Sequence, residues 1–334
     1  METAPPWMRP RGWFQVGWSG EVGSGEVFTV RCFGSDVVLY RDADGPALHA
    51  LDRRCQHLGA HLGVGGTVSG DCIVCPFHGW TWGPDGRNRE IPYAEQPNRS
   101  RRIATWQVCE RNGIIYIWHD PEGGPPQWEM PDLFESLHDG DPTGPFHDAY
   151  PAGVVRYEGL TVQPRITAEN IVDPPHFMYV HGTKRMPTVV DHEITDHTFR
   201  TRLHAPSRGK GDGSVAAKPD MVTLMSVGVG VQYTRFAGRD NTHGIYSCTP
   251  ADDRHSTLFQ TIWIEQLDGE QPDATAARLR AVASVYPEDH RIWANQEFLD
   301  VPGLTAGEAP LFRELRRFCR QFEPRAAQPA ETPA

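Results

Sequence analysis

Short apolar runs separated by turn residues predict strands in the first third of the chain. Residues 27–30 and 37–40 are rich in β-branched and aromatic side chains, and the Gly, Ser and Asp residues around them are typical of hairpins. Residues 114–118 form the run Ile-Ile-Tyr-Ile-Trp, which predicts a buried strand because Asn112-Gly113 and Asp120-Pro121 bound it. This region is therefore expected to be a small unit made of β-strands.

The second half of the chain mixes strand and helix patterns. Residues 222–236 and 244–266 predict strands, whereas residues 273–285 predict a helix because Ala and Leu recur at helical spacing. A second helix is expected at residues 287–300, since proline is favoured in a first helical turn. Residues 311–322 predict an amphipathic helix whose apolar side chains lie near one face.

A stretch dense in Pro, Gly and Asp at residues 121–146 indicates the boundary between two domains. We therefore expect a first domain at residues 1–125, a linker at 126–146 and a second domain at 147–325. The Pro- and Ala-rich tail at residues 326–334 is expected to be disordered.

Composition and charge narrow the class of protein. The 334 residues suit two modest domains, and an apolar fraction of 39% is enough for a real core. The formal net charge is −11 and the longest basic cluster is residues 99–102, so neither nucleic acid nor an anionic membrane is an expected partner. There is no apolar segment typical of a signal peptide, and the most apolar stretch, residues 221–231, is too short to cross a bilayer. We therefore expect a soluble, cytoplasmic protein.

Seven cysteines occur in the chain, and most of them stand alone in mixed sequence. An odd count without an export signal argues against a disulfide framework, so clustered cysteines are interpreted first as metal ligands. The isolated cysteines are expected to be packed thiols, because a free cysteine behaves as a small buried hydrophobe. They are Cys32, Cys109, Cys248 and Cys319.

The clearest chemical signal is a pair of short segments that each contain one cysteine and one histidine. Cys55 and His57 form the first segment, and Cys75 and His78 form the second, with 17 residues between the two segments. Two thiolates on one iron and two imidazoles on the other are what an asymmetric two-iron cluster requires. Nearby glycines allow two tight loops to close over such a cluster. These glycines are Gly59, Gly63, Gly65, Gly66 and Gly79.

Zinc is the alternative metal for the same residue types. Zinc usually pairs cysteine with cysteine and histidine with histidine, whereas each segment here supplies one of each, which favours the iron–sulfur cluster. Cys72 is the nearest competing thiol. We interpret it as structural, because residues 72–75 are typical of a strand that enters the second loop.

A second group of potential metal ligands lies downstream. His176 and His181 are five residues apart, and with a distant carboxylate they would form the facial triad of a mononuclear non-haem Fe(II) site. Such a site leaves coordination positions open for dioxygen beside a substrate. The chain contains 15 histidines, so the pair alone is weak evidence.

The two patterns together resemble the oxygenase components of Rieske-type non-haem iron enzymes. The pattern Asn170-x-x-Asp173-x-x-His176-x-x-x-x-His181, this far after a Rieske motif, is similar to the signature of their catalytic domains. The resemblance spans nearly the whole chain. Gly86-Arg87, Ile91-Pro92-Tyr93 and Trp118-His119-Asp120, with the two Cys–His segments, are most similar to the oxygenase component of 3-ketosteroid 9α-hydroxylases. This resemblance implies an α+β protein, in which a small all-β Rieske domain precedes an α+β catalytic domain with an antiparallel sheet flanked by helices.

The resemblance also implies a role for each residue of these patterns. The four residues of the Cys–His segments would hold a Rieske [2Fe–2S] cluster, while His176 and His181 would bind the mononuclear iron. Asp173 would be a catalytic residue that links this iron to the cluster of a neighbouring subunit, through hydrogen bonds to a ligand histidine on each side. Asn170 belongs to the same catalytic signature.

The sequence departs from related patterns in two places. Ala60 and Phe77 stand where Rieske proteins of respiratory and photosynthetic chains carry the cysteines of an inter-loop disulfide, so the site resembles the lower-potential centres of oxygenases. Pro174-Pro175 is unusual within the catalytic signature. Proline is tolerated in the first helical turn, so Asp173 is also a candidate N-cap of a helix that begins there.

The third iron ligand, a carboxylate, is implied by the resemblance to lie in residues 287–296. Asp289 matches best and Glu288 is the second choice, whereas Glu297 would lie over two helical turns away. An acidic residue at a helix start also has an ordinary explanation, because it stabilises the helix dipole.

The activity implied by the resemblance is that of a monooxygenase. It would act on a bulky apolar molecule, assemble as a homotrimer and receive electrons from a separate flavin- and iron–sulfur-containing reductase. The chain has no Gly-x-Gly-x-x-Gly dinucleotide site, so NAD(P)H would be oxidised by that reductase. Steroid, polyketide, alkaloid and aromatic substrates all fit. Desaturation or O-demethylation at the same site stays open, as do an electron carrier without mononuclear iron and a zinc-stabilised binding module.

Overall fold

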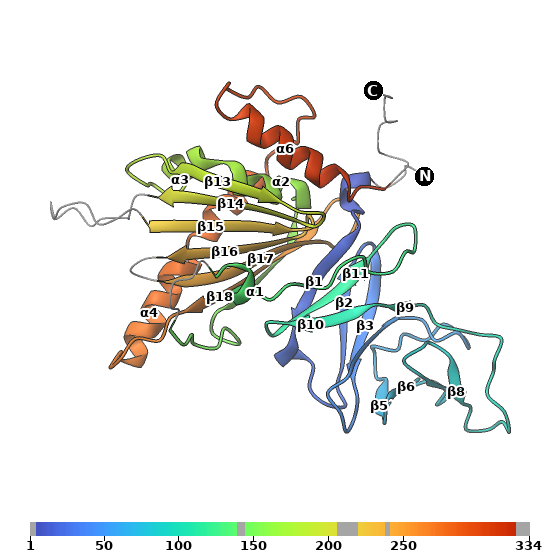
Figure 1. The fold of residues 1–334 in the computed structure, drawn as a ribbon. Coiled ribbons are helices and arrows are strands. Elements are labelled where there is room, and N and C mark those ends of the chain that lie inside the picture. The colour runs from blue at the N-terminus through green and yellow to red at the C-terminus, as the bar shows by residue number, and fades with distance from the viewer. Residues whose placement is uncertain (1–4, 139–143, 206–219, 238–240, 325–334) are drawn as a thin grey trace.

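The computed structural model describes residues 5–138, 144–205, 220–237 and 241–324. It consists of a strand-rich N-terminal module joined to a larger module of sheet and helices (Figure 1). The predicted disordered tail, residues 326–334, lies outside the described residues. No helix within the described ranges is long and apolar enough to cross a membrane.

Small antiparallel sheets form the N-terminal module (Figure 1). The first has the order β1-β11-β10, with β1 (Gly12–Trp18), β11 (Ile114–His119) and β10 (Val108–Arg111). The second has the order β2-β3-β4-β9, with β2 (Val27–Cys32), β3 (Ser35–Arg41), β4 (Leu48–Asp52) and β9 (Thr105–Trp106). The third has the order β5-β6-β7-β8, with β5 (Thr67–Ser69), β6 (Cys72–Val74), β7 (Thr81–Trp82) and β8 (Asn88–Glu90). The predicted hairpin strands and the buried strand at 114–118 are confirmed.

A large antiparallel sheet with the order β12-β18-β17-β16-β15-β14-β13 is the centre of the second module. Its strands are β12 (Val154–Leu160), β13 (Thr188–Ile194), β14 (Thr198–Ala205), β15 (Asp220–Val227), β16 (Val231–Ala237), β17 (Thr242–Pro250) and β18 (Ser256–Ile264). Each region predicted as strand folds as a hairpin, because 222–236 spans β15 and β16 and 244–266 spans β17 and β18. The expected α+β class with an antiparallel sheet is confirmed.

Short helices complete the second module (Figure 1). The α-helices are α1 (Leu133–Ser136), α2 (Pro164–Glu169), α3 (Pro174–Tyr179), α4 (Pro272–Ala283), α5 (Tyr286–Trp293) and α6 (Ala309–Arg320). Single 3-10 turns are η1 (Pro6–Met8), η2 (Ser19–Glu21) and η3 (Asn170–Val172). The helices predicted at 273–285 and 311–322 are confirmed as α4 and α6.

The helix predicted at residues 287–300 is wrong in its length, since α5 ends at Trp293. The Asn295 side chain donates its Nδ2 to the Arg291 carbonyl at 2.9 Å, which is the acceptor that the Asn295 N–H would use in a continuing helix. The Asn295 N–H turns instead to the Ile292 carbonyl at 3.0 Å. The Asn295 side chain therefore takes the place of a backbone hydrogen bond where the helix ends.

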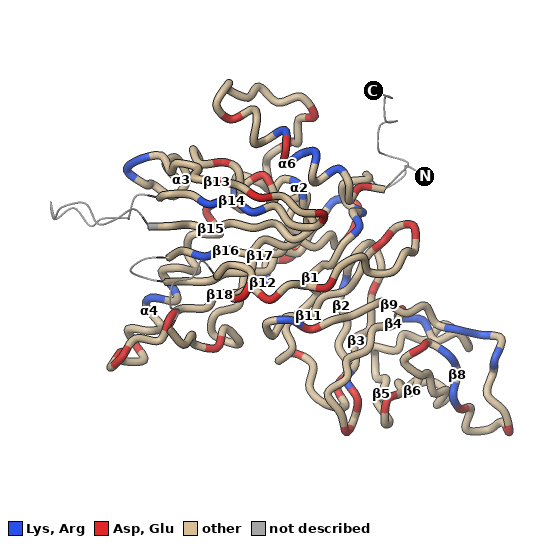
Figure 2. The backbone as a smooth tube through the Cα atoms, in the orientation of Figure 1, with Lys and Arg blue, Asp and Glu red and all other residues tan. Residues whose placement is uncertain are grey.

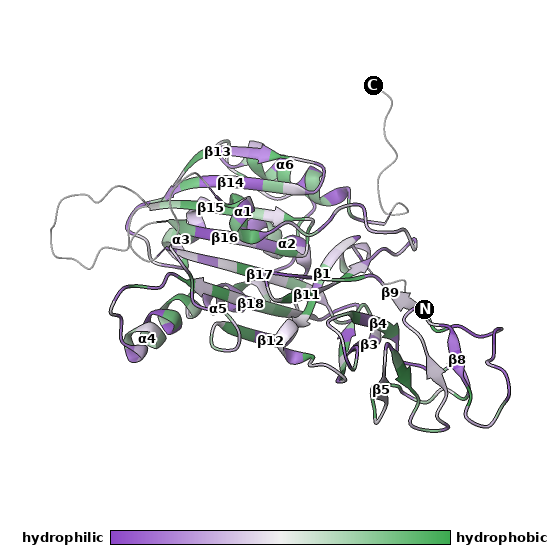
Figure 3. Ribbon diagram, turned by 60° about the horizontal axis from the view of Figure 1, so that its bottom comes forward, coloured by the Kyte–Doolittle hydropathy of each residue, from purple (hydrophilic) through white to green (hydrophobic). Residues whose placement is uncertain are grey.

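Charge and hydropathy are unevenly distributed over the N-terminal module. Figure 2 shows basic residues gathered at β8 and in the loop that follows it. Figure 3 shows β8 and this loop as largely hydrophilic, whereas β3 and β4 contain hydrophobic residues. The end of the module that carries β8 is thus its more polar end.

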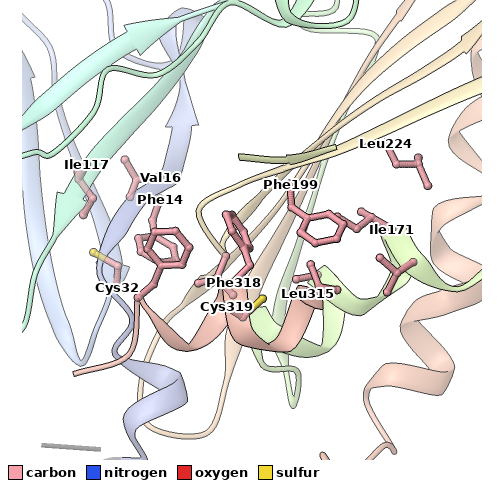
Figure 4. Close-up of a cluster of buried hydrophobic side chains, with 14 of the residues drawn as sticks. Phe14, Val16, Cys32, Ile117, Ile171, Phe199, Leu224, Leu315, Phe318 and Cys319 are labelled. Carbon is pink, nitrogen blue, oxygen red and sulfur yellow. The ribbon is translucent and has the colours of Figure 1, made fainter. Parts of the chain in front are cut away.

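Two apolar cores cross from one module to the other. The first joins Phe14 of β1 to Phe199 of β14 and Leu315 of α6 (Figure 4). The second joins Trp13 of β1 to buried residues of β15, β16 and β17. The segment that we expected to be a linker also reaches this second core, where the Trp13 Nε1–H donates to the Trp128 carbonyl at 2.7 Å. Strand β1 therefore fixes the two modules against each other.

We expect Leu315→Ala to destabilise the protein by about 2–5 kcal/mol, the usual range for truncating a buried leucine. Leu315 is fully buried beside Phe199 and Phe318, so its loss would leave a cavity between α6 and the large sheet. Urea unfolding measures the effect. Arg317→Ala on the exposed side of the same helix is the control and should change stability by less than about 0.5 kcal/mol. Equal effects would mean that α6 does not stabilise the core.

Candidate metal centres

Two loops of the N-terminal module form a cradle with matching backbone turns. Cys55 lies after β4 and Cys75 lies directly after β6. The Gly59 N–H donates to the Cys55 carbonyl at 2.9 Å, and the Gly79 N–H donates to the Cys75 carbonyl at 3.0 Å. Both glycines have a positive φ, 79° and 71°, which residues with a Cβ rarely adopt. The same turn therefore follows each cysteine.

The four expected ligands converge inside this cradle. The thiols of Cys55 and Cys75 lie close enough to interact, and burial raises the pKa of the Cys55 thiol. The rings of His57 and His78 lie 4.8 Å apart, and the Nδ1 atom of each is buried without a hydrogen-bond partner among the described residues. Two sulfurs beside two unpaired imidazole nitrogens are the donor set of an asymmetric iron–sulfur cluster, so these residues fit that group.

Cys72, the nearest other thiol, bonds to a neighbouring acid and not to the four expected ligands. Cys72 is buried at the start of β6, and its Sγ–H donates to Asp71 Oδ1 at 3.0 Å.

Three exposed apolar side chains form what we call the apolar rim of the cradle. They are Leu58, Val64 and Phe77, which are 66%, 70% and 61% exposed. An exposed apolar rim next to a candidate redox centre is a feature that a partner surface would cover.

The second candidate centre lies where α3 faces α5. Helix α3 begins with Pro174 and Pro175, whose missing N–H groups cost nothing in the first helical turn. His176 lies in α3, His181 lies just beyond its end, and Asp289 lies in α5. One ligand atom from each of these three residues lies within 4.8 Å of the others. The structure thus brings the expected ligand trio together.

Hydrogen bonds orient both imidazoles of the trio. The His176 Nδ1–H donates to the Asp173 carbonyl, and His181 Nδ1 lies 2.9 Å from Glu288 Oε2. His181 Nε2 lies 3.4 Å from Asp289 Oδ2. Because the outer Nδ1 of each ring is held by a partner, Nε2 remains available to a metal.

Two neighbouring acids, which the sequence left as alternatives, lie on different sides of His181. Glu288 faces the outer nitrogen and its side chain is 49% exposed. Asp289 faces the inner nitrogen and its side chain is 5% exposed. This arrangement favours Asp289 as a metal ligand and gives Glu288 the task of orienting the imidazole.

Burial and charge act differently on the two imidazoles. Burial lowers the pKa of His176 to about 4, although Asp289 opposes the shift. Burial also acts on His181, but the carboxylates of Asp289 and Glu288 outweigh it and raise the pKa of that residue. A ligating imidazole is neutral, so metal binding would release the proton that His181 carries below its raised pKa.

Asp173 lies between the ligand trio and a cavity. Its carboxylate makes no capping hydrogen bond to α3, so the capping role considered from the sequence is wrong. Asp173 Oδ2 lies 4.0 Å from His176 Nδ1, and the side chain is 34% exposed. Burial raises the pKa of Asp173. The cavity has a volume of about 230 Å³, and Asn170, Glu169 and Arg316 also line it.

Sequence reasoning missed a buried polar group on the sheet side of the trio. His290 follows Asp289, and its ring lies 4.5 Å from the rings of both Tyr157 and Tyr286. Its Nε2 has no hydrogen-bond partner among the described residues, and burial lowers the pKa of His290 to about 4. The Tyr157 hydroxyl donates to Gln260 Oε1 at 3.2 Å. Gln260, a polar residue with a large side chain in the buried strand β18, is a signal of this group in the sequence.

Two family models match successive parts of the chain. Residues 12–107 match the Rieske [2Fe-2S] domain, and residues 117–322 match the 3-ketosteroid 9alpha-hydroxylase C-terminal domain. The chain is similar to a probable 3-ketosteroid-9-alpha-monooxygenase oxygenase component of Rhodococcus rhodochrous, with 31% identity covering 95% of this chain and 81% of the relative. It is also similar to a cholesterol 7-desaturase of Bombyx mori, with 43% identity covering 95% of this chain and 70% of the relative.

Solved structures share the fold at lower identity. Dicamba monooxygenase bound to dicamba has a TM-score of 0.70 and 16% identity, covering 96% of this chain and 98% of that one. NdmA of Pseudomonas putida CBB5 with caffeine has a TM-score of 0.68 and 19% identity, covering 92% of this chain and 89% of that one. These likenesses confirm the fold class that the sequence predicted.

Proposed function

The chain belongs to the Rieske-type oxygenase family with a 3-ketosteroid 9α-hydroxylase C-terminal domain, and on that premise we propose that it hydroxylates a bulky apolar substrate. Membership makes it a Rieske-type non-haem iron monooxygenase. The steroid-like or polycyclic character of the substrate is our inference from the relatives' names. The observation that carries the proposal is that one chain brings together two unlike sets of candidate metal ligands.

The residues of the two centres would have distinct tasks. When bound, a [2Fe–2S] cluster and Fe(II) would store electrons and activate dioxygen. Asp289 would offset the charge of the divalent ion, and Glu288 would keep the inner nitrogen of His181 aimed at it. The residues that would hold the cluster are Cys55, His57, Cys75 and His78, and those that would hold the iron are His176, His181 and Asp289.

Electron transfer between the subunits of a homotrimer is part of the proposal. Figure 1 shows strands β5, β6 and β8, which lie near the cradle in the sequence, and helix α3 at opposite ends of the molecule. The apolar rim of the cradle is exposed, and so in part is Asp173. Docking the rim of one subunit beside Asp173 of the next would bury both surfaces and would join the two centres through one carboxylate.

Product analysis with a generic reductase tests the proposed function. Protein reconstituted with iron and sulfide should contain about three irons per chain, whereas an electron carrier without the mononuclear site would contain about two. Steroids, polyketides, alkaloids and aromatic compounds are then incubated with NADH, the reductase and labelled dioxygen. We expect a hydroxylated product that carries one labelled oxygen atom. Two irons per chain and no product from any class would assign the chain as a carrier.

Desaturation is the second candidate, because the relative with 43% identity is a cholesterol 7-desaturase. The same centres would remove two hydrogens from a substrate and, with two electrons from the reductase and two protons, reduce dioxygen to two molecules of water. The labelled-dioxygen experiment separates the two reactions, because a desaturated product gains a double bond and no labelled oxygen.

A further inference from the structure

An exposed group of arginines lies beside the cradle, at the more polar end of the N-terminal module (Figure 2). We call it the arginine patch, and it consists of Arg87, Arg89, Arg99, Arg101 and Arg102, all exposed. A β-bridge between Arg87 and Arg102 joins the two segments that carry the patch. Residues 85–102 contain these five arginines against three acids, in a chain whose net charge is −11. The patch is therefore a positive region on an acidic protein.

Part of the patch is unpaired within the chain. Asp85 lies 3.1 Å from Arg89 and 3.7 Å from Arg87, measured between carboxylate oxygen and guanidinium nitrogen. Neither Arg99 nor Arg101 makes an ion pair with any residue that the structure describes. Their charges are free to attract an acidic partner, and a planar guanidinium suits paired contacts to carboxylates.

Direct contacts connect the neighbourhood of the patch to the cradle. Tyr93 lies in the loop between the two arginine segments and is 63% exposed. The Trp80 Nε1–H donates to the Tyr93 hydroxyl at 2.8 Å. The buried Trp80 ring stacks on the His57 ring, with centroids 4.4 Å apart and an interplanar angle of 3°. One hydrogen bond and one ring stack thus separate a partner that covers Tyr93 from His57, a residue expected to hold the cluster.

We propose that the arginine patch docks an acidic one-electron carrier protein, which delivers its electron through Tyr93, Trp80 and His57. The inference deepens the proposed function and rests on it, because it requires a cluster in the cradle. The reduced carrier loses one electron, the oxidised cluster gains it, and no bond or proton is transferred.

A separate carrier fits the patch better than a second copy of the chain does. Complexes for electron transfer are small and are steered by complementary charge, whereas the centres of subunit interfaces are apolar. The apolar rim, formed by Leu58, Val64 and Phe77, offers such a subunit contact, and the arginine patch shares no residue with it. The two surfaces can therefore serve two partners.

Charge reversal tests the docking surface. The test variant is Arg99→Glu with Arg101→Glu. The control is Arg313→Glu with Arg317→Glu on the exposed side of α6, which changes the net charge equally and also breaks no ion pair of the described residues. The probe is a reduced plant-type [2Fe–2S] ferredoxin, an acidic one-electron carrier, and stopped-flow absorbance follows reduction of the chain's cluster.

We expect the patch variant to be reduced at least about ten-fold more slowly than the parent at low ionic strength, and to lose most of the salt dependence. The control variant should stay close to the parent. Equal rates in both variants would overturn the proposal. A change in the mass of the assembly, measured by light scattering and seen only in the patch variant, would also overturn the proposal. It would show that the patch contacts a second copy of the chain.

The electron route has its own test. Tyr93→Ala should lower the limiting rate of reduction at saturating ferredoxin and leave the half-saturating concentration unchanged. An unchanged limiting rate would overturn the route. In each variant, the visible spectrum and reduction by dithionite should match the parent, which shows that the cradle is intact.

Chemical reduction separates this inference from the proposed function. Enzyme reduced by dithionite and then mixed with substrate and dioxygen needs no carrier. If the parent forms no product under these conditions, the proposed function fails, although slower reduction of the patch variant would still locate the docking surface. If the parent and the patch variant form equal product after chemical reduction, any defect with ferredoxin belongs to docking.

Discussion

Asp289→Ala should release the mononuclear iron and reduce turnover to below about 1% of the parent, because loss of an orienting partner outside the ligand set already costs about 10–100-fold. Asp289 is the buried acid of the trio, and its Oδ2 lies 3.4 Å from the inner nitrogen of His181. Without it, two neutral imidazoles would have to hold a divalent cation. Iron analysis after desalting and product formation measure the two effects. The visible spectrum of the cradle should remain that of the parent.

The neighbouring acid provides a matched pair of controls. Glu288→Ala should weaken iron binding by about 10–100-fold, and excess Fe(II) should restore turnover. Glu288→Gln should stay close to the parent, because its amide oxygen can still accept the Nδ1–H of His181. If Glu288→Ala loses the iron permanently and Asp289→Ala keeps it, the two roles assigned here are exchanged.

The cradle could be predicted from the sequence because its determinants are local. The Cys–His spacing fixes which donors lie in each loop, and Gly59 and Gly79 allow the turn that follows each cysteine. The same holds for the histidine pair, since His176 and His181 lie within one short helix and its end. Short-range geometry alone brings these side chains to their positions.

The choice between Glu288 and Asp289 as the carboxylate ligand could not be made from the sequence, because it depends on the tertiary structure. Glu288 and Asp289 are adjacent in α5, so their side chains leave the helix in different directions and only the placement of α5 against α3 decides which one faces inward. The buried polar group formed by His290, Tyr157 and Gln260 was missed for the same reason, because tertiary structure brings its members together. His290 and Gln260 come from α5 and β18, and no sequence pattern joins them.

The prediction that the Asp173 side chain caps α3 was wrong, and the sequence itself contains the reason. An N-cap side chain usually bonds the N–H of the second or third helical residue. The second residue of α3 is Pro175, which has no N–H, so only the His176 N–H remains for the cap. The backbone of Asp173 has φ −112° and ψ 79°. Its carbonyl accepts the Nδ1–H of His176, which leaves the carboxylate free to face the cavity.

The backbone carbonyl and the side-chain carboxylate of Asp173 thus have separate roles, and this separation leads to the second large expected effect. Asp173→Asn should retain both metals and slow the arrival of electrons at the mononuclear site by about 10–100-fold, as expected for loss of a carboxylate that bridges two ligand imidazoles. The backbone carbonyl that orients His176 is unchanged by the substitution, so iron affinity should be unchanged. Stopped-flow oxidation of the reduced cluster in the presence of substrate and dioxygen measures the rate.

A control from the same cavity separates the bridge from a general effect on the cavity wall. Gln296 lines the cavity with Asp173, is exposed and carries no charge, so Gln296→Ala should leave cluster oxidation near the parent rate. Normal single-turnover kinetics in Asp173→Asn would remove its bridging role. Loss of iron from Asp173→Asn would show instead that the carboxylate supports His176 directly, since its Oδ2 lies 4.0 Å from Nδ1 of that residue. Slow cluster oxidation with full iron content is the result that only a bridging carboxylate predicts.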